Sequence, residues 1–344
     1  MNTLKRILAV LCIVLLLSGC AAPAKPTVPT VPAGSTGLTV HFIDVGQADC
    51  ALLECDGAYI LIDGGNVEDS SLVVSYLKKA GVKELSAVFC THAHEDHAGG
   101  LSGALAVFPT KAVYAPTNSY SSKCFEDFVR YTGKQGLSIT IPSPGNKIQF
   151  GGATVEVLGP VKDYSETNDT SLVLMVTYGA NRFLFTGDME TTAETDLIES
   201  GADLRADVLK VGHHGSETSS GYRFLREVMP QHAVISVGEG NSYGHPHDVI
   251  LSRLRDADAT VYRTDKLGHI IAVSDGTKVT FSWEQSGQPT VPDDSEQVYI
   301  GNKNSKKFHL NTCANLPKEE NQVLFHSYDE AIQAGYSPCG QCFG

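Results

Sequence analysis

Short runs of apolar residues, separated by Gly and Asp turns, dominate the chain from residue 39 onward. Such runs are typical of buried strands, whereas apolar positions at helical spacing indicate amphipathic helices. Strands are therefore predicted at 39–44, 50–55, 59–62, 85–90, 153–158, 171–178, 182–186, 206–211 and 233–237, and helices at 71–80, 189–200 and 248–256. The first three strands should form a meander. Because both halves are β-rich, we expect an α/β fold in which two sheets pack as a sandwich with helices outside.

One apolar run differs from the others, because it extends without interruption from Ile7 to Leu17 after the basic residues Lys5 and Arg6. It is shorter than the roughly 20 apolar residues that span a bilayer and ends in small residues before Cys20, which predicts a lipoprotein signal peptide at 1–19. Membrane lipid would then be attached through Cys20. The alternative is an uncleaved membrane anchor. In both cases the body of the protein lies outside the cytoplasmic membrane.

Two Pro-rich stretches divide the rest of the chain. Residues 20–38 are almost uncharged and predict an extended tether, and residues 284–297 predict a linker rich in Pro, Gly and acidic residues. Between them, residues 39–283 are numerous enough to bury one large core. Residues 298–344 form a short module that needs further stabilisation.

The net charge limits which partners the protein can bind, and the cysteine content limits which disulfides it can form. The net charge is −13, and loss of the signal peptide would leave 24 basic against 39 acidic residues, a net charge of −15. This is not the basic footprint of a nucleic-acid-binding protein, although a basic cleft or bound cations could still bind phosphates. Without Cys12 and Cys20, seven of the nine cysteines remain, and an odd number excludes a fully paired disulfide framework.

The segment that carries chemistry follows the predicted strand at 85–90 and reads THAHEDHAGG, from Thr91 to Gly100. Three imidazoles and a carboxylate within six residues can converge on a metal because the chain turns here. Zinc takes such nitrogen and oxygen ligands at about 2.0–2.2 Å and can leave one position open for water. The alternative is a solvated, His-rich turn.

This segment resembles the HxHxDH motif of the metallo-β-lactamase superfamily. The resemblance implies an αββα sandwich with two divalent metal ions, zinc or manganese. Residue by residue, it places His92 and His94 at the first metal, and Asp96 and His97 at the second. A water molecule held between two cations has a lowered pKa, so hydroxide would be the nucleophile and Asp96 would orient it.

Two later segments resemble the same family. The segment FTGD at 185–188 implies that Asp188 bridges both metals, although a strand ending in Gly-Asp is also an ordinary turn. The segment LKVGHHGS at 209–216 resembles the ComEC-like subgroup. It implies that His214 completes the second metal site, while His213 and Ser216 face the substrate and His213 contacts a phosphoryl oxygen. The alternative is a pair of surface histidines.

Further matches to this subgroup lie at 41–49 (HFIDVGQAD) and in three other segments. Asp63, in IDGG, would orient the metal ligands through hydrogen bonds. Asn168, in NDTSLV, stands where other members supply a histidine, so the first metal would have fewer His ligands and Asn168 would contact metal or substrate. His245, in NSYGHPH, is a rival metal ligand or a proton donor to the substrate, and the alternative is a structural role.

The C-terminal module contains His309 and Cys313, followed by the CxxC segment of Cys339 and Cys342. These four residues predict a tetrahedral structural zinc site, which a module this small needs because its core is limited. The module resembles the zinc-binding domain of Ada-type repair proteins, but His309 stands where that family has the methyl-accepting cysteine, so methyl transfer is not expected. The alternative is a Cys339–Cys342 disulfide.

These features together predict an extracellular, lipid-anchored, metal-dependent hydrolase, with Asp96, His213 and His245 in the catalytic set. The expected substrate is a phosphodiester such as DNA or an envelope polymer. A lactonase or β-lactamase acting on carboxyl derivatives is the first alternative, because the fold permits it. A non-catalytic surface binding protein is the second.

Overall fold

A computed structural model of the chain describes residues 37–291, 298–310 and 313–343. The predicted signal peptide at 1–19, the lipid site Cys20 and nearly all of the tether lie outside the described residues. Strand β1 begins at Leu38, whose side chain is fully buried, one residue before the predicted strand. Within the described ranges, no helix has both the length and the apolar character needed to cross a membrane.

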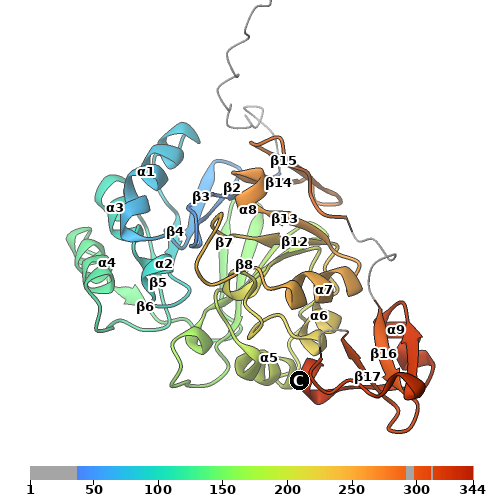
Figure 1. Cartoon of the computed structure of the whole chain (residues 1–344). Helices are drawn as coiled ribbons and strands as arrows, with labels where there is room; N and C mark the ends of the chain where they lie inside the picture. Colours follow the sequence, from blue (N-terminus) through green and yellow to red (C-terminus); the bar gives the residue numbers. More distant parts are fainter. Residues whose placement is uncertain (1–36, 292–297, 311–312, 344) are drawn as a thin grey trace, which may run out of the picture.

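Two β-sheets form the centre of the main domain (Figure 1). The first has the strand order β15 (Val279–Trp283), β14 (Ile270–Ser274), β1 (Leu38–Phe42), β2 (Ala51–Cys55), β3 (Ala58–Ile62), β4 (Ala87–Phe89), β5 (Val113–Tyr114) and β6 (Ile139–Thr140). The second has the order β13 (Thr260–Arg263), β12 (His232–Ile235), β11 (Val208–Lys210), β10 (Asn181–Phe185), β9 (Val173–Tyr178), β8 (Ala153–Gly159) and β7 (Lys147–Phe150). Apolar side chains of both sheets share one core, in which Phe42 stacks on Phe185. The predicted sandwich is confirmed.

Helices cover both outer faces of the sandwich (Figure 1). One apolar cluster joins the first sheet to α1 (Ser70–Lys79), α3 (Leu101–Val107) and α4 (Lys123–Lys134). Another joins the second sheet to α5 (Thr191–Glu199), α6 (Tyr222–Val228) and α7 (Asp248–Asp256). Two single turns, α2 (Glu95–Ala98) and α8 (Thr264–Leu267), lie in loops. The layer order is αββα, as the resemblance implied.

Strand direction decides where the loops emerge. The first three strands form the expected antiparallel meander, but β4 runs parallel to β3, and β10, β11, β12 and β13 are mutually parallel. The carboxyl ends of parallel strands lie at one edge of their sheet, where loops commonly build sites. The loops after β4, β10 and β11 begin at such ends, and they contain the residues with predicted metal roles.

The C-terminal module is a third, four-stranded sheet in the order β18 (Gln322–Phe325), β16 (Tyr299–Asn302), β17 (Lys307–Leu310) and β19 (Ser337–Pro338). Two short helices, α9 (Tyr328–Gln333) and α10 (Gly340–Phe343), complete it. In the predicted linker, Thr290 pairs with Val261 of β13, so the described part of this segment runs along the main domain.

Candidate active site

The loop after β4 brings the motif residues into a partly helical turn. His94 precedes α2, which contains Asp96 and His97. The imidazoles of His92 and His97 are fully buried, whereas Asp96 remains partly exposed to the cleft described below.

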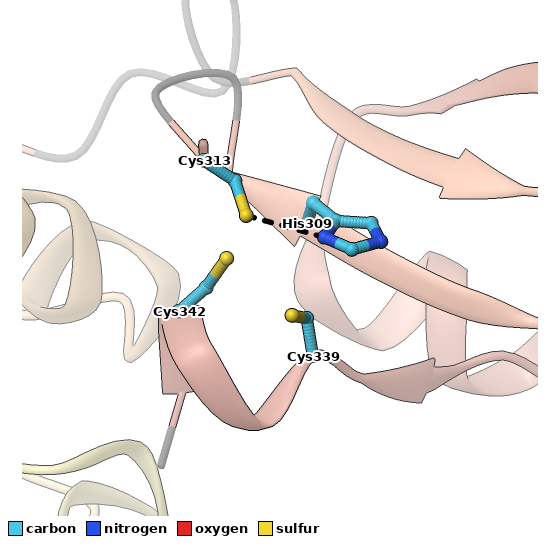
Figure 2. Close-up of side chains that lie close together, drawn as sticks. All are labelled: His309, Cys313, Cys339 and Cys342. Atoms are coloured by element: carbon cyan, nitrogen blue, oxygen red, sulfur yellow. Dashed lines mark hydrogen bonds between the residues drawn. The ribbon is translucent and has the colours of Figure 1, made fainter. Parts of the chain in front are cut away.

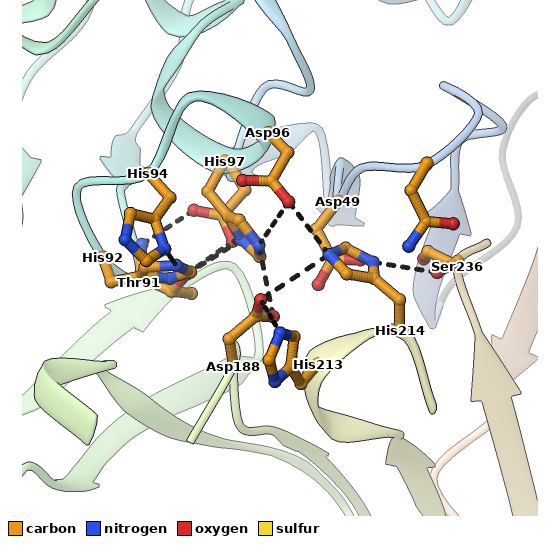
Figure 3. A network of polar contacts seen from close by, with 12 residues as sticks. Asp49, Thr91, His92, His94, Asp96, His97, Asp188, His213, His214 and Ser236 are labelled. Carbon is orange, nitrogen blue, oxygen red and sulfur yellow. Dashed lines mark hydrogen bonds and ion pairs between the residues drawn. The ribbon is translucent and has the colours of Figure 1, made fainter. Parts of the chain in front are cut away.

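Four residues from three loops converge at the centre of this site (Figure 3). Asp96, His97, Asp188 and His214 each offer a ligand atom, and these atoms all lie within 4.8 Å of one another. His97 Nε2 is 3.2 Å from Asp188 Oδ1, and His214 Nε2 is 3.2 Å from Asp96 Oδ2 and 3.6 Å from Asp188 Oδ2. The structure thus brings together the four residues to which the resemblance gave the second metal.

The orientation of the two imidazoles is set by hydrogen bonds on their far sides. His214 Nδ1 is 3.0 Å from the carbonyl oxygen of Ser236, which can only accept, so this nitrogen carries the proton. His97 Nδ1 donates to Asp63 Oδ2 at 2.9 Å. Both Nε2 atoms therefore face the carboxylates, which is the orientation that ligating histidines require. Burial opposes protonation of the two rings, but the neighbouring carboxylates raise the pKa of His97 and His214, so a bound metal would displace the Nε2 protons.

Asp63 stabilises the His97 ring from the side that faces away from Asp188. Its carboxylate accepts hydrogen bonds from the backbone N–H and the hydroxyl of Thr91, both at 2.7 Å, in addition to the one from His97. Because Asp63 is fully buried, its contacts anchor the start of the motif loop to the end of β3. This is the orienting geometry that the sequence interpretation gave to Asp63.

The other two motif histidines lie beside the four-residue group and are not part of it. His92 Nε2 is 3.0 Å from His94 Nδ1, and the ring of His92 is 4.1 Å from that of His97. Burial lowers the pKa of His92 well below its usual value, so its imidazole is neutral. Asn168 lies in the wall of the adjoining cleft, where its amide donates to Glu190 Oε1 at 3.1 Å.

The donor set fits a divalent cation. His97 Nε2 and Asp188 Oδ1 are buried and lack a hydrogen-bond partner, although nearly all buried polar atoms in proteins have one. Burial opposes ionisation of Asp188, but His97 and His214 outweigh it and hold the pKa of this carboxyl well below its usual value. An anionic carboxylate and neutral imidazole nitrogens are the ligands that zinc or manganese takes.

His213 and His214 are adjacent in sequence but have different surroundings, because both adopt left-handed backbone conformations with φ of 50° and 53°. Such a conformation costs roughly 1–2 kcal/mol for a residue with a side chain, and it concentrates at functional sites. His214 turns toward Asp96. His213 lines the cleft, with Nδ1 3.3 Å from Glu190 Oε1 and 3.2 Å from Thr218 Oγ1.

These residues open into a cleft of about 830 Å³, which also contains His94, Asn168 and His245. Gln47 fixes the ring of His245: its Oε1 accepts from the Gly238 N–H, so its amide nitrogen donates to His245 Nδ1 at 3.3 Å. His245 therefore carries its proton on Nε2. Burial and the neighbouring histidines lower the pKa of His245 to about 4, so the ring is neutral near pH 7.

Ser216 lies apart from this cleft. Its side chain is buried, and its hydroxyl is 3.0 Å from Thr218 Oγ1, within its own loop. The structure does not bring Ser216 to the cleft wall where His213 lies, although the sequence interpretation gave both residues a contact with substrate.

Sequence reasoning assigned no role to a buried ion pair beneath the site. Lys210 Nζ is 2.8 Å from Asp49 Oδ2, both side chains are buried, and Asp49 Oδ1 is 3.5 Å from His214 Nδ1. The available signal was a lysine between the apolar residues Leu209 and Val211 of a predicted strand, since lysine is almost never fully buried without a partner.

The C-terminal module has its own cluster of donors (Figure 2). His309, Cys313, Cys339 and Cys342 each place a ligand atom within 4.8 Å of the others, and His309 Nδ1 lies 3.3 Å from Cys313 Sγ. The cysteines come from the end of β17 and the turn around α10, and all are free thiols. One nitrogen and three sulfur donors suit a tetrahedral structural zinc.

Comparison with known families agrees with both sites. The Metallo-beta-lactamase superfamily matches residues 43–239, and the metal binding domain of Ada matches residues 290–343. The chain is 31% identical over 250 residues to ComE operon protein 3 of Bacillus subtilis and 32% identical over 228 residues to competence protein ComA of Neisseria gonorrhoeae.

These matches cover 67% and 65% of this chain but only 32% and 30% of the relatives, so the chain spans about a third of their length. Among solved structures, the metallo-beta-lactamase fold protein YhfI from Bacillus subtilis has a TM-score of 0.45 and 16% identity. The alignment covers 66% of this chain and 96% of YhfI.

Proposed function

This chain belongs to the metallo-β-lactamase superfamily, whose fold uses divalent metals for hydrolysis, and we propose that it is a phosphodiesterase. The observation that carries the proposal is the group of Asp96, His97, Asp188 and His214, of which all but His97 line a cleft of about 830 Å³. Clefts of roughly 300–1,000 Å³ are the usual size for substrate binding. Two divalent cations are proposed, one held by this group and one by His92 and His94.

The bound cations would supply Lewis-acid chemistry at the phosphoryl group and acidify water. The remaining steps belong to protein side chains. His213 stands at the cleft wall beside Asp188 and is placed to donate to a phosphoryl oxygen. His245, whose ring is neutral with its proton on Nε2, is placed to donate a hydrogen bond to the leaving oxygen. The partly exposed Asp96 orients the attacking water.

Two considerations support a phosphodiester over a carboxyl derivative. The relatives named above are competence proteins, and the segments LKVGHHGS and NDTSLV resemble the ComEC-like subgroup. In addition, neutral donors such as His245 and Asn168 face the cleft, and these can bind phosphate oxygens once cations offset the acidic residues. DNA or a phosphodiester polymer of the cell envelope is the proposed substrate.

The proposal includes a location outside the cell, with lipid attached through Cys20. It rests on the basic, apolar and small-residue order of residues 1–20. Mass spectrometry of the purified full-length protein should detect a lipid-modified Cys20. A Cys20→Ser variant that still fractionates with membranes in the same amount would contradict the anchor.

Activity is tested with the protein lacking residues 1–19, loaded with manganese or zinc. We expect hydrolysis of bis-p-nitrophenyl phosphate and cleavage of single-stranded DNA, and at least about a 100-fold loss in Asp188→Asn and His214→Ala. His326→Ala changes an exposed histidine of the C-terminal module and should leave the rate unchanged. Hydrolysis of nitrocefin or a lactone without phosphodiester hydrolysis would overturn the proposal.

A further inference from the structure

The C-terminal module lies beside the main domain near α6 (Figure 1), and Tyr222 of α6 belongs to the apolar core of the module. The ring of Tyr222 stacks on that of Tyr328 at 4.8 Å and lies 4.8 Å from that of Phe343. Phe343 directly follows Cys342, one of the four proposed zinc ligands. A change in the geometry of the zinc cluster would therefore change the packing around the ring of Tyr222.

Tyr222 is in turn tied to helix α7. Its hydroxyl donates to Asp256 at 2.6 Å, and the guanidinium of Arg253 lies 5.7 Å from the centre of its ring. Aromatic rings attract a guanidinium at this separation, and the attraction strengthens when both groups are withdrawn from water. Arg253 is 6% exposed, so its guanidinium is withdrawn from water beside the ring of Tyr222.

The guanidinium of Arg253 also reaches the loop that follows His213 and His214. Its Nη1 donates to the backbone carbonyls of Glu217, Ser219 and Ser220, at 3.3, 3.1 and 3.4 Å. We call residues 217–220 the clamped segment. These three carbonyls would be costly to leave without a hydrogen-bond donor. Arg253 therefore restricts the path of this segment.

A second buried side chain holds the other side of the clamped segment. Glu194 on α5 accepts hydrogen bonds from the backbone N–H groups of Ser220 and Gly221. Ser220 has a positive φ of 52°, which a serine adopts only when its surroundings impose it. Both peptide groups of Ser220 are thus fixed by the side chains of Arg253 and Glu194, which come from two helices.

The clamped segment contacts the loop of Asp188 as well. Thr191 N–H donates to the Thr218 carbonyl at 2.9 Å, and Ser219 Oγ donates to the Met189 carbonyl at 2.8 Å. A displacement of this segment would therefore move His213, His214 and Asp188 relative to Asp96. All four belong to the proposed active site.

We propose that Arg253 is a positioning residue that fixes the loop of His213 and His214, and that the C-terminal module braces Arg253 through Tyr222. The module then contributes to the geometry of the hydrolase site without touching substrate. The activity readout rests on the phosphodiesterase proposed above. The metal-affinity and spectroscopic readouts do not depend on that proposed activity.

Five variants of the protein lacking residues 1–19 separate the steps. Arg253→Gln removes the cation, and Arg253→Lys retains a charge that can still donate to the carbonyls. Tyr222→Leu removes the ring, and Tyr222→Phe retains it. Arg223→Gln is the matched control, because Arg223 lies on α6 but is exposed and pairs only with the exposed Glu199 at 3.5 Å among the described contacts.

Cobalt distinguishes the two sites in each variant. Thiolate-to-cobalt charge transfer reports the cysteine-containing module. Both sites give visible ligand-field bands with cobalt, so the bands of the main domain are recorded after the module has been filled with zinc and shows no charge transfer. We expect Arg253→Gln to change the ligand-field bands and to lower metal affinity at the main site by about 10-fold or more, as loss of residues that orient ligands commonly does. Turnover should fall by at least about 10-fold, since small misplacements are costly.

Arg253→Lys should recover most of the affinity and turnover, and Tyr222→Leu should resemble Arg253→Gln with a smaller effect. Tyr222→Phe keeps the ring but loses the hydrogen bond to Asp256, so it should lie between Tyr222→Leu and wild type. Arg223→Gln should match wild type. Unchanged ligand-field bands and affinity in both Arg253→Gln and Tyr222→Leu would overturn the proposal. Altered bands in Arg253→Gln with wild-type behaviour in Tyr222→Leu would overturn the bracing role of the module. If no variant, wild type included, cleaves phosphodiesters, the proposed function fails while the spectra still decide the role of Arg253.

Discussion

His214 Nε2 lies 3.2 Å from Asp96 Oδ2, although 118 residues separate them in the sequence. Asp96 belongs to the loop after β4 in the first sheet, and His214 belongs to the loop after β11 in the second. The proposed site therefore exists only when the two sheets pack against each other. The carbonyl of Ser236 then fixes the His214 ring so that its free nitrogen faces the carboxylates.

Asp63→Ala should weaken metal binding without removing a proposed ligand. Asp63 holds His97 and both polar groups of Thr91, and loss of such an orienting partner typically costs about 10–100-fold in metal affinity. Isothermal titration with zinc or manganese measures the effect. Asp127→Ala, which removes two surface ion pairs on α4, with Lys123 and Arg130, is the control and should bind metal like wild type. Equal affinity in the two variants would show that Asp63 does not orient the site.

Lys210→Met should strongly destabilise the main domain. It leaves the Asp49 carboxylate buried beside His214 without its cation, and breaking a buried pair in this way typically costs about 3–5 kcal/mol. Urea unfolding measures the loss. Lys111→Met breaks an exposed pair with Glu84 and should cost at most about 1 kcal/mol. Similar losses in both variants would contradict the special role of the buried pair.

Glu194→Gln should alter how stability depends on pH. Burial raises the pKa of Glu194 from 4.5 to about 7, in spite of hydrogen bonds from Gly221 and Ser220. Between these values the folded state keeps a proton that the unfolded state has lost, so the contribution of Glu194 to stability falls as pH rises from 4.5 to 7.

That fall can amount to about 3 kcal/mol, and glutamine has no proton to lose. Denaturation at pH 5 and pH 8 should therefore show that Glu194→Gln gains stability relative to wild type at the higher pH. The contrary result, a parallel pH dependence in the two proteins, would place the Glu194 pKa near its ordinary value.

The C-terminal module should bind about one equivalent of zinc through its four donors. Metal analysis of purified protein should show that Cys339→Ser loses this zinc, whereas Cys124→Ala, which changes a buried thiol of α4, retains it. Thiol titration of the metal-free protein separates the alternatives. A Cys339–Cys342 disulfide would remove two reactive thiols in wild type and leave the zinc content unaffected by Cys339→Ser.

Local patterns predicted the parts of the fold and site that depend on nearby residues. The strand expected at 85–90 is shorter in the structure, but it ends before His92 as predicted, because an apolar run can only be buried up to the polar turn. Helix 248–256 was predicted with its observed bounds from its apolar spacing. The motif histidines face one another because a turn of six residues leaves them little room to diverge.

Contacts between distant segments could not be predicted in the same way. Ser216 follows the His213–His214 pair directly, yet the left-handed conformations of both histidines turn the loop so that Ser216 is buried. Lys210 and Asp49 become partners only because β11 and the loop after β1 meet under the site. No local pattern marks Arg253 as the donor to residues 217–220.

The sequence by itself determined the two-sheet sandwich, the donor types of the main site and the four cysteine and histidine donors of the C-terminal module. It could do so because periodicity and ligand chemistry are encoded locally. Only the tertiary structure decided which donors share one point, which imidazole nitrogen is free and how the C-terminal module meets the main domain. These depend on backbone angles, strand register and packing between segments that are far apart along the chain.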